Sequence, residues 1–357
     1  MWLLLLALAC TSRGDCGLDH VDIARVLRSA ERGRANQCEL GGLREWIERR
    51  RATHGPWKQD IGVARSADGL LWEAVRNTDG SPHVVIPGAA VPEVVEAPDG
   101  RLWLYFVDGD LDDLLEGASN PENGFADRGL PGVGALGAAV STDGLSFQRV
   151  ADAQIRGLGV GLFADPDIVP IPRGGWRMFY LAMGVDEYTR AATWEAGEKH
   201  AIHTAVSRDL VRWAAEGLAV HGPYADPSLA CFEGGNCTLF SYGLDTSTSV
   251  GGGPLTYQGP WSGTKGFAPE VLSQSPREAR VYFNDTTKGA PLKVKRTTDA
   301  GRTWQDELGS SLDVYGEAAT VVRRRDGTWW MYFHMFKPGA RLESVPDPDP
   351  ESYPDEE

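Results

Sequence analysis

Two aspartates of the sequence occupy the same position in a repeated pattern. Asp165 and Asp226 each directly precede a proline at the start of a strand-forming run, whereas Val91 and Ala268 hold that position in other copies. Two such carboxyl groups, if brought together, could act as general acid and general base, because burial and like-charge repulsion raise the pKa of at least one. An Asp-Pro pair is also a common turn, in which Asp accepts backbone N–H bonds, so a structural role stays open.

The pattern that carries the two aspartates recurs five times. Each copy has an inner run around the proline or its equivalent, at residues 91–95, 165–169, 226–230, 268–272 and 318–322. An aromatic run follows each of them, at residues 103–106, 176–180, 238–242, 280–283 and 329–333. Short loops, most of them containing Gly or Asp, join the two runs, which predicts pairs of neighbouring strands.

A third recurring part is a polar turn of the type Ser-x-Asp-Gly that an aromatic residue closes. It occupies residues 66–72, 141–147, 207–213 and 297–304. We interpret it as structural, with Asp bound to the turn backbone, Gly at positive φ and the aromatic ring between sheets. The unit at 66–72 precedes every inner run and the fifth inner run lacks one. It is therefore expected to supply the outer strand of the last sheet and to close a ring without unpaired edges.

The spacing of the copies predicts the fold. Anchor positions 92, 166, 227, 269 and 319 lie 74, 61, 42 and 50 residues apart, which suits four-stranded blades. The predicted class is all-β, a five-bladed β-propeller over residues 59–336, preceded by a partly helical segment at 11–58. Residues 337–357 form an acidic, Pro-rich tail that is expected to be disordered because it cannot bury enough apolar surface.

The first ten residues predict an export signal. They form an apolar run, which is too short for a membrane span of about 20 residues. Ala7-Leu8-Ala9-Cys10 resembles a bacterial lipobox, in which Cys10 would be lipidated and become the mature N-terminus. The expected location is therefore the bacterial envelope, as a lipid-anchored protein, with an ordinary secretory signal and a secreted protein as the alternative.

The cysteines agree with export. Five are present, so removing Cys10 leaves an even number, as expected of a disulfide framework in an oxidising compartment. Cys231 and Cys237 flank a short predicted hairpin loop, where a bridge is geometrically easy, and Cys16 and Cys38 form the second predicted pair.

Charge and motif content limit the partners. The net charge is −15, and residues 342–357 supply seven of these negative charges. Without a basic stripe, nucleic acid is not an expected partner, because phosphate binding needs clustered Lys and Arg. The sequence shows neither a Cys/His cluster with zinc spacing nor a Gly-rich phosphate loop, so no metal and no cofactor are predicted.

Two stretches carry a family resemblance, residues 207–213 (Ser-Arg-Asp-Leu-Val-Arg-Trp) and residues 317–332. Together with the Asp-Pro inner runs, they make residues 59–336 similar to the five-bladed propeller glycoside hydrolases of the arabinanase, levansucrase and invertase superfamily, especially glycoside hydrolase family 43. The resemblance implies an axial pocket with three carboxylates: Asp165 as general base, Asp226 as the group that tunes the acid, and Glu317 or Glu270 as the acid. In the family the three acids come from successive blades, whereas Asp165, Asp226 and Glu317 belong to the second, third and fifth inner runs.

The same resemblance implies a carbohydrate partner. Phe163, Tyr224 and Phe267 would stack on sugar rings, although the three residues equally suit packing. His334 ends the last aromatic strand and would contact sugar or a central ion, with a satisfied core histidine as the structural alternative. The leading hypothesis is an exported glycoside hydrolase that acts on a glycan at the axial pocket and meets the membrane only through its lipid anchor. The alternative is a non-catalytic surface propeller that binds glycan or protein.

Overall fold

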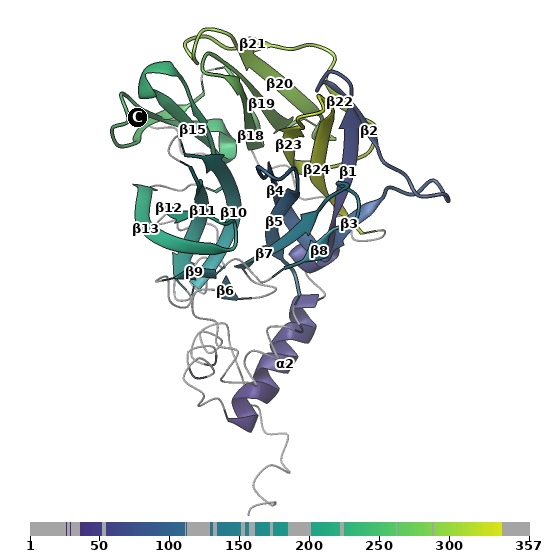
Figure 1. The fold of residues 1–357 in the computed structure, drawn as a ribbon. Helices are drawn as coiled ribbons and strands as arrows, with labels where there is room; N and C mark the ends of the chain where they lie inside the picture. Colours follow the sequence, from purple (N-terminus) through teal and green to yellow (C-terminus); the bar gives the residue numbers. More distant parts are fainter. Residues whose placement is uncertain are drawn as a thin grey trace, which may run out of the picture.

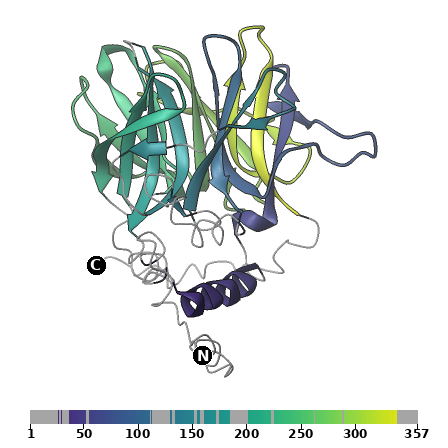
Figure 2. The same ribbon diagram turned by 60° about the horizontal axis from the view of Figure 1, so that its bottom comes forward.

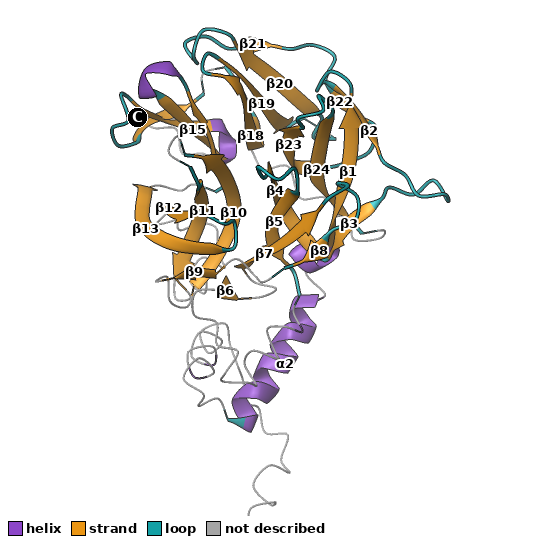
Figure 3. Ribbon diagram, viewed as in Figure 1, coloured by secondary structure: helices purple, strands orange, loops and turns teal. Residues whose placement is uncertain are grey.

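Five β-sheets surround a common axis in the computed structural model of the protein (Figures 1 and 2). The structure describes residues 26, 29, 36–51, 55–110, 112, 129–130, 134–150, 154–156, 161–171, 174–184, 201–221, 225–261, 263–287 and 289–337. Each sheet has its innermost strand at the axis and contains four strands in antiparallel order from the axis outwards, and in two sheets a further short strand pairs in parallel at the outer edge. The predicted five-bladed propeller is confirmed, and Figure 3 shows how strongly strands dominate it.

The first three blades follow one another along the chain. Blade 1 contains β4 (Ala89–Glu96), β5 (Leu102–Asp108), β7 (Gly134–Ser141) and β8 (Gln148–Arg149), with β6 (Gly129–Leu130) beside β7. Blade 2 contains β10 (Gly161–Pro170), β11 (Trp176–Gly184), β12 (Ala201–Ser207) and β13 (Arg212–His221), with β9 (Gln154–Arg156) beside β13. Blade 3 contains β14 (Ser228–Cys231), β15 (Cys237–Ser241), β16 (Asp245–Ser249) and β17 (Thr256–Pro260).

The fifth blade joins the two ends of the propeller. Blade 4 contains β18 (Gly266–Ser275), β19 (Glu278–Asp285), β20 (Leu292–Thr297) and β21 (Gln305–Asp306). Blade 5 begins with β23 (Glu317–Arg323) and β24 (Trp329–Phe336) and continues with β1 (Gln59–Ser66) and β2 (Leu71–Ala74), flanked by β3 (Val84–Pro87) and β22 (Ser311–Leu312). Because β1 pairs with β24 from Gln59↔Phe336 to Ser66↔Trp329, the predicted ring closure by the N-terminal unit is confirmed.

The polar turns have one hydrogen-bonding pattern. In the turn between β1 and β2, Ser66 Oγ accepts the N–H groups of Asp68 and Gly69 at 3.2 and 2.9 Å. Asp68 Oδ1 accepts the N–H groups of Leu70 and Leu71 at 2.8 and 3.1 Å. The turns that begin at Ser141 and Ser207 repeat these bonds. Gly69 has a φ of 78°, so the turn needs a residue that tolerates the left-handed region. The structural role predicted for these turns is confirmed.

Each of these turns is also a contact between blades. The hydroxyl of Tyr282 in blade 4 donates to Gly69 O of the blade 5 turn at 3.1 Å, and that of Tyr332 in blade 5 donates to Gly144 O of the blade 1 turn at 3.0 Å. Tyr105 in blade 1 donates in the same way to Leu210 O of blade 2. The aromatic residue that closes each turn packs edge-on against the same tyrosine, as Trp72 does on Tyr282 at 6.2 Å.

Phenylalanine replaces this tyrosine in the two remaining blades. Phe179 and Phe240 stand opposite the inner strand at the position that Tyr105 and Tyr282 occupy elsewhere. Blade 3, which is next to the blade of Phe179, has no Ser-x-Asp turn between β16 and β17. The corresponding turn of blade 4, which faces Phe240, is one residue longer than the turns in the other blades. A tyrosine hydroxyl at these two positions would lack the backbone carbonyl that the turn of the next blade offers elsewhere. Burial of a hydroxyl without a hydrogen-bond partner is unfavourable.

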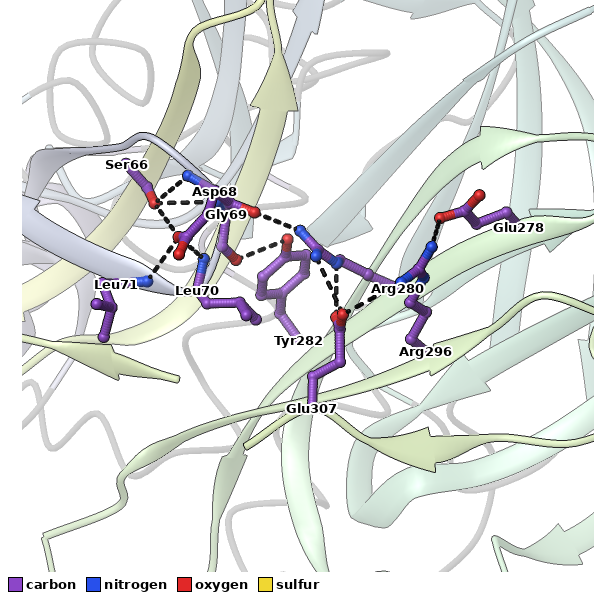
Figure 4. A network of polar contacts seen from close by, with 10 residues as sticks. All are labelled: Ser66, Asp68, Gly69, Leu70, Leu71, Glu278, Arg280, Tyr282, Arg296 and Glu307. Atoms are coloured by element: carbon purple, nitrogen blue, oxygen red, sulfur yellow. Dashed lines mark hydrogen bonds and ion pairs between the residues drawn. The ribbon is translucent and has the colours of Figure 1, made fainter. Parts of the chain in front are cut away.

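Arg280 adds a charged contact at the seam between blades 4 and 5 (Figure 4). Its Nη1 donates to Asp68 O at 2.7 Å, its Nε lies 2.6 Å from Glu307 Oε2, and the guanidinium lies over Trp329. A Cβ on Gly69 would lie 2.6 Å from Arg280 Nη1 and 2.9 Å from a ring carbon of Trp329, so a side chain at this position would displace the guanidinium. The seam next to the chain closure is therefore fixed by both polar and aromatic contacts.

The N-terminal segment contributes α2 (Gln37–Arg51), which lies outside the ring of sheets (Figure 2). Asn36 caps the helix, since Glu39 N donates to Asn36 Oδ1 and Asn36 N to Glu39 Oε2, both at 2.9 Å. No described helix is long and apolar enough to cross a membrane. The predicted signal at 1–10, including Cys10, and the tail from 338 onwards lie outside the described residues.

The Cys231–Cys237 disulfide is present, as predicted from the short loop between β14 and β15. A 3₁₀ turn, η3 (Glu233–Gly235), forms that loop. Cys38 in α2 is also disulfide-bonded, while its predicted partner Cys16 lies outside the described residues.

We expect Tyr282→Phe to lower the free energy of unfolding by about 1–2 kcal/mol, because the buried carbonyl of Gly69 loses its donor. Urea unfolding followed by tryptophan fluorescence measures this change. Tyr180→Phe is the matched control, since the buried Tyr180 hydroxyl has no partner among the described residues. Equal losses for the two variants would contradict a specific contribution of the contact between blades.

Candidate active site

The five inner strands share a kink where they approach the axis. The residue before each proline or its equivalent has positive φ: Val91 45°, Asp165 52°, Asp226 48°, Ala268 49° and Ala318 46°. In blade 1 the kink is a β-bulge, because Ala90 pairs with Val107 and Glu93 with Tyr105, which leaves two residues opposite one. Positive φ is unfavourable for a β-branched residue such as Val91, so the fold and not the residue type imposes the conformation. Strain of this kind clusters at functional sites.

The kinks bring acids from three blades to one end of the axis. Asp226 N donates to Asp165 Oδ2 at 3.2 Å, which places the second and third blades in direct contact. The charges of Asp165 and Glu317 both act on the carboxyl group of Asp226. We call Asp165, Asp226, Glu317 and His334 the mouth group. All four were predicted site residues.

Glu317 is held by two donors, Tyr315 and His334. The Tyr315 hydroxyl donates to Glu317 Oε1, and His334 Nε2 lies 3.4 Å from Glu317 Oε2. Val91 N donates to His334 Nδ1 at 3.5 Å. Since Nδ1 accepts this bond, the proton of the neutral imidazole belongs on Nε2, which then donates to Glu317.

The two aspartates differ electrostatically. Burial raises the pKa of Asp165 to about 6, against the lowering effects of the Asp226 N–H group and of His334. The pKa of Asp226 is raised well above its ordinary value, first by burial and then by the negative charges of Asp165 and Glu317. At neutral pH, Asp165 is therefore the more readily ionised of the two.

A second layer of polar side chains closes the axis below the mouth group. It consists of the residues that follow the proline or its equivalent, and we call it the axial ring: Glu93, Asp167, Ser228, Glu270 and Thr320. Each accepts the N–H group of the next blade. The donors and distances are, in the same order, Ile168 at 3.0 Å, Leu229 at 3.2 Å, Val271 at 2.8 Å, Val321 at 3.1 Å and, back in blade 1, Val94 at 3.1 Å. The five bonds form a closed circuit.

Glu270, the alternative acid, belongs to this ring and not to the mouth group. Its Oε1 accepts Val321 N and the Thr320 hydroxyl, and its Oε2 lies 3.4 Å from the Ser228 hydroxyl. As expected for a residue after the proline, it emerges at a different level from Asp165. A cavity of about 20 Å³ separates the two levels, lined by Glu270 and Asp165 among others, with room for about one water molecule.

Three ring acids lie close enough to share a cation or protons. Glu93, Asp167 and Glu270 each offer an oxygen within 4.8 Å of the others. Burial raises the pKa of Glu270 to about 7, and burial with like-charge repulsion raises those of Glu93 and Asp167 well above their ordinary values. Protons therefore neutralise part of this layer near pH 7. Sequence comparison of the five copies exposes the ring positions, but it does not show that they bond to one another.

The aromatic candidates occupy different environments. Phe163 is 3% exposed and packs edge-on against Tyr180 at 6.0 Å, inside the core between blades. Phe267 is partly buried, and its ring lies 6.4 Å from that of Tyr242, which is 52% exposed. Tyr242 N donates to Ala225 O beside the mouth group, a proximity that no sequence signal indicated. Tyr224 lies outside the described residues.

The fold and the mouth group define a class of protein, a five-bladed propeller with clustered axial carboxylates.

No protein-family model and no curated protein matches the chain. Solved structures do resemble it, and they include glycoside hydrolases of family 43. An exo-1,5-α-L-arabinanase from a bovine ruminal metagenomic library is 14% identical, covering 68% of this chain and 86% of that one with a TM-score of 0.43. A xylan β-1,4-xylosidase from Bacillus halodurans is 11% identical, covering 71% and 50% with a TM-score of 0.48.

A β-1,3-galactosidase of family 43, solved with galactodeoxynojirimycin, is 10% identical and covers 75% of this chain and 95% of that one with a TM-score of 0.46. At such identities the likeness concerns the fold.

We expect the buried carboxyl group of Glu270 to make the stability of the protein fall as the pH rises from about 4 to about 7. Folded Glu270 has a pKa of about 7, above its value of roughly 4.3 in an unfolded chain, so the folded state retains a proton that the unfolded state releases. The stability from this proton is complete below about pH 4 and is lost as the pH rises through about 7, with a slope of up to about 1.4 kcal/mol per pH unit.

Glu270→Gln should make this decline shallower, since the amide cannot ionise, whereas Glu73→Gln on the exposed face of β2 should not. Urea unfolding at a series of pH values measures both slopes. Parallel curves for wild type and Glu270→Gln would be evidence against a protonated ring.

Proposed function

We propose that the protein is a glycoside hydrolase that acts on a glycan at the mouth group. The observation that carries this proposal is the convergence of Asp165, Asp226 and Glu317 from three blades at one end of the axis. Glycoside hydrolysis needs one protonated and one ionised carboxyl group on either side of the scissile bond. Raised pKa values that differ within one site are the usual sign of such a division.

Asp165 is the general base in this proposal. With a pKa of about 6 it is ionised at neutral pH, and an ionised carboxylate can take a proton from the attacking water. The general acid comes from the pair formed by Asp226 and Glu317. Phe267, with Tyr242 beside it, supports stacking of a sugar ring near the mouth.

A second candidate function is a non-catalytic surface propeller that binds glycan or protein. The small volume of the cavity between the mouth group and the axial ring, about 20 Å³, favours it.

Asp165→Asn should abolish turnover, with a loss of about 10²–10⁴-fold in kcat, and leave the melting temperature close to that of the wild type. The assay is hydrolysis of a panel of chromogenic pentosides and hexosides. Asp79→Asn in an exposed turn is the control and should keep full activity. Undiminished activity of Asp165→Asn would contradict the role of Asp165 as general base. A wild-type protein that binds glycans on an array but cleaves none of the panel would favour the non-catalytic propeller.

We also propose that the protein is exported and anchored through a lipid on Cys10. The lipobox-like run before Cys10 supports this, and the Cys231–Cys237 disulfide fits an oxidising compartment. Mass spectrometry of the mature protein from a bacterial host should find Cys10 diacylated at the N-terminus. Cys10→Ser should release the protein from the membrane fraction, and a mature N-terminus at any other residue would contradict the anchor.

A further inference from the structure

The surroundings of Glu317 favour its ionised form. Both carboxylate oxygens meet a donor, Oε1 the Tyr315 hydroxyl and Oε2 the Nε2 of His334 at 3.4 Å. His334 keeps its proton on Nε2 because Val91 N donates to Nδ1. Hydrogen bonds to both oxygens stabilise a carboxylate relative to the neutral acid.

The surroundings of Asp226 favour the protonated, neutral form of its carboxyl group. Its backbone N–H group donates to Asp165, and among the described residues no N–H or O–H group donates to its carboxyl oxygens. The charged groups that act on its carboxyl group are Asp165 from β10 and Glu317 from β23. His334 from β24 acts on Asp165 and lies against Glu317. Glu93 and Glu270 of the axial ring line the same cavity from below, and the described lining residues include neither lysine nor arginine.

We propose that Asp226, and not Glu317, carries the proton of this site and delivers it to the glycosidic oxygen. The inference rests on the proposed function and reverses the roles that the family resemblance implies for Asp226 and Glu317. Glu317 becomes a positioning residue, whose negative charge and fixed orientation keep the proton on Asp226. The raised pKa of Asp226, which burial and the charges of Asp165 and Glu317 cause, is consistent with this.

The chemical step balances with these two aspartates. The proton of Asp226 passes to the glycosidic oxygen as the bond from that oxygen to the anomeric carbon breaks. A water oxygen forms the new bond to the anomeric carbon, and its proton passes to Asp165. Asp165 then releases its proton to solvent and Asp226 takes one up from solvent, which restores the starting state.

The place of the proton can be measured without any substrate. In ¹³C-Asp-labelled full-length protein, an NMR titration follows the side-chain carboxyl resonances, and Asp165→Asn and Asp226→Asn assign two of them. The resonance of Asp226 should titrate at higher pH than that of Asp165. Glu317→Gln should lower the midpoint of Asp226, since it removes a negative charge. An Asp226 that titrates below Asp165, or a midpoint unmoved by Glu317→Gln, would overturn the proposal.

Labelled glutamate gives a second measurement that needs no change at Asp226. The Glu317 resonance, assigned by its loss in Glu317→Gln, should remain that of an ionised carboxylate at pH values where Asp226 is protonated. A Glu317 that is the last of the three to lose its proton would overturn the inference even if Asp226→Asn does not fold.

Leaving-group dependence then tests the catalytic role. On aryl glycosides with a poor leaving group, Asp226→Asn should lose about 10²–10⁴-fold in kcat, and a dinitrophenyl leaving group, which departs without a proton, should restore most of it. Glu317→Gln should lose a similar factor on both substrates and shift the pH profile. The reverse pattern would return the acid role to Glu317. If the wild type cleaves neither substrate, the proposed function fails, while the titrations still decide which residue holds the proton.

Discussion

The closed circuit of five hydrogen bonds around the axis is the constraint on which the rest of the structure depends. Each ring side chain accepts a backbone N–H group of the next inner strand, from Glu93 to Ile168 and finally from Thr320 to Val94. A circuit of this kind fixes all five strands at one height, because a shift of one strand would break two of its bonds. The residues just before the prolines are then held at the end of the axis, and any acid among them becomes part of the mouth group.

The circuit brings several carboxyl groups close together at the axis. Contacts elsewhere in the propeller must therefore offset the repulsion between them. Glu93, Asp167 and Glu270 repel one another in one layer, and the mouth group forms a second acidic layer next to it. Protons relieve this repulsion, since an uncompensated buried charge is far less stable than a neutral acid. The contacts between blades lie further from the axis. There, tyrosines donate hydrogen bonds to the turns of neighbouring blades, and Arg280 of blade 4 binds the turn between β1 and β2 of blade 5.

Departures from the five-fold pattern occur where neighbouring blades differ. Phe179 replaces tyrosine beside the one blade without a Ser-x-Asp turn, so the hydroxyl and its acceptor are absent together. At the kink of the inner strands, Val91 and Ala268 occupy the positions that aspartates hold in blades 2 and 3, and both keep positive φ. The kink therefore belongs to the scaffold, and the side chain on it determines the chemistry. Asp165 on the adjacent blade 2 and Glu317 on blade 5, which is not adjacent to blade 3, give Asp226 its two negatively charged neighbours.

The sequence by itself determined the architecture, because each copy of the pattern is local: proline kink, inner strand, aromatic strand and polar turn can be recognised within about 50–70 residues, and a unit left over at the front implies closure of the ring. It also selected Asp165 and Asp226 by their position in the copies, and Glu317 through the resemblance to the propeller glycoside hydrolases. Only the tertiary structure decided that Glu270 lies in the axial ring, that Phe163 packs in the core, and that Tyr315 and His334 hold Glu317. These relations join residues from different blades, or depend on which way a side chain leaves a bulged strand. Strand periodicity cannot specify the contacts between blades or these side-chain directions, because one extra residue in a strand turns the following side chains to the opposite face of the sheet.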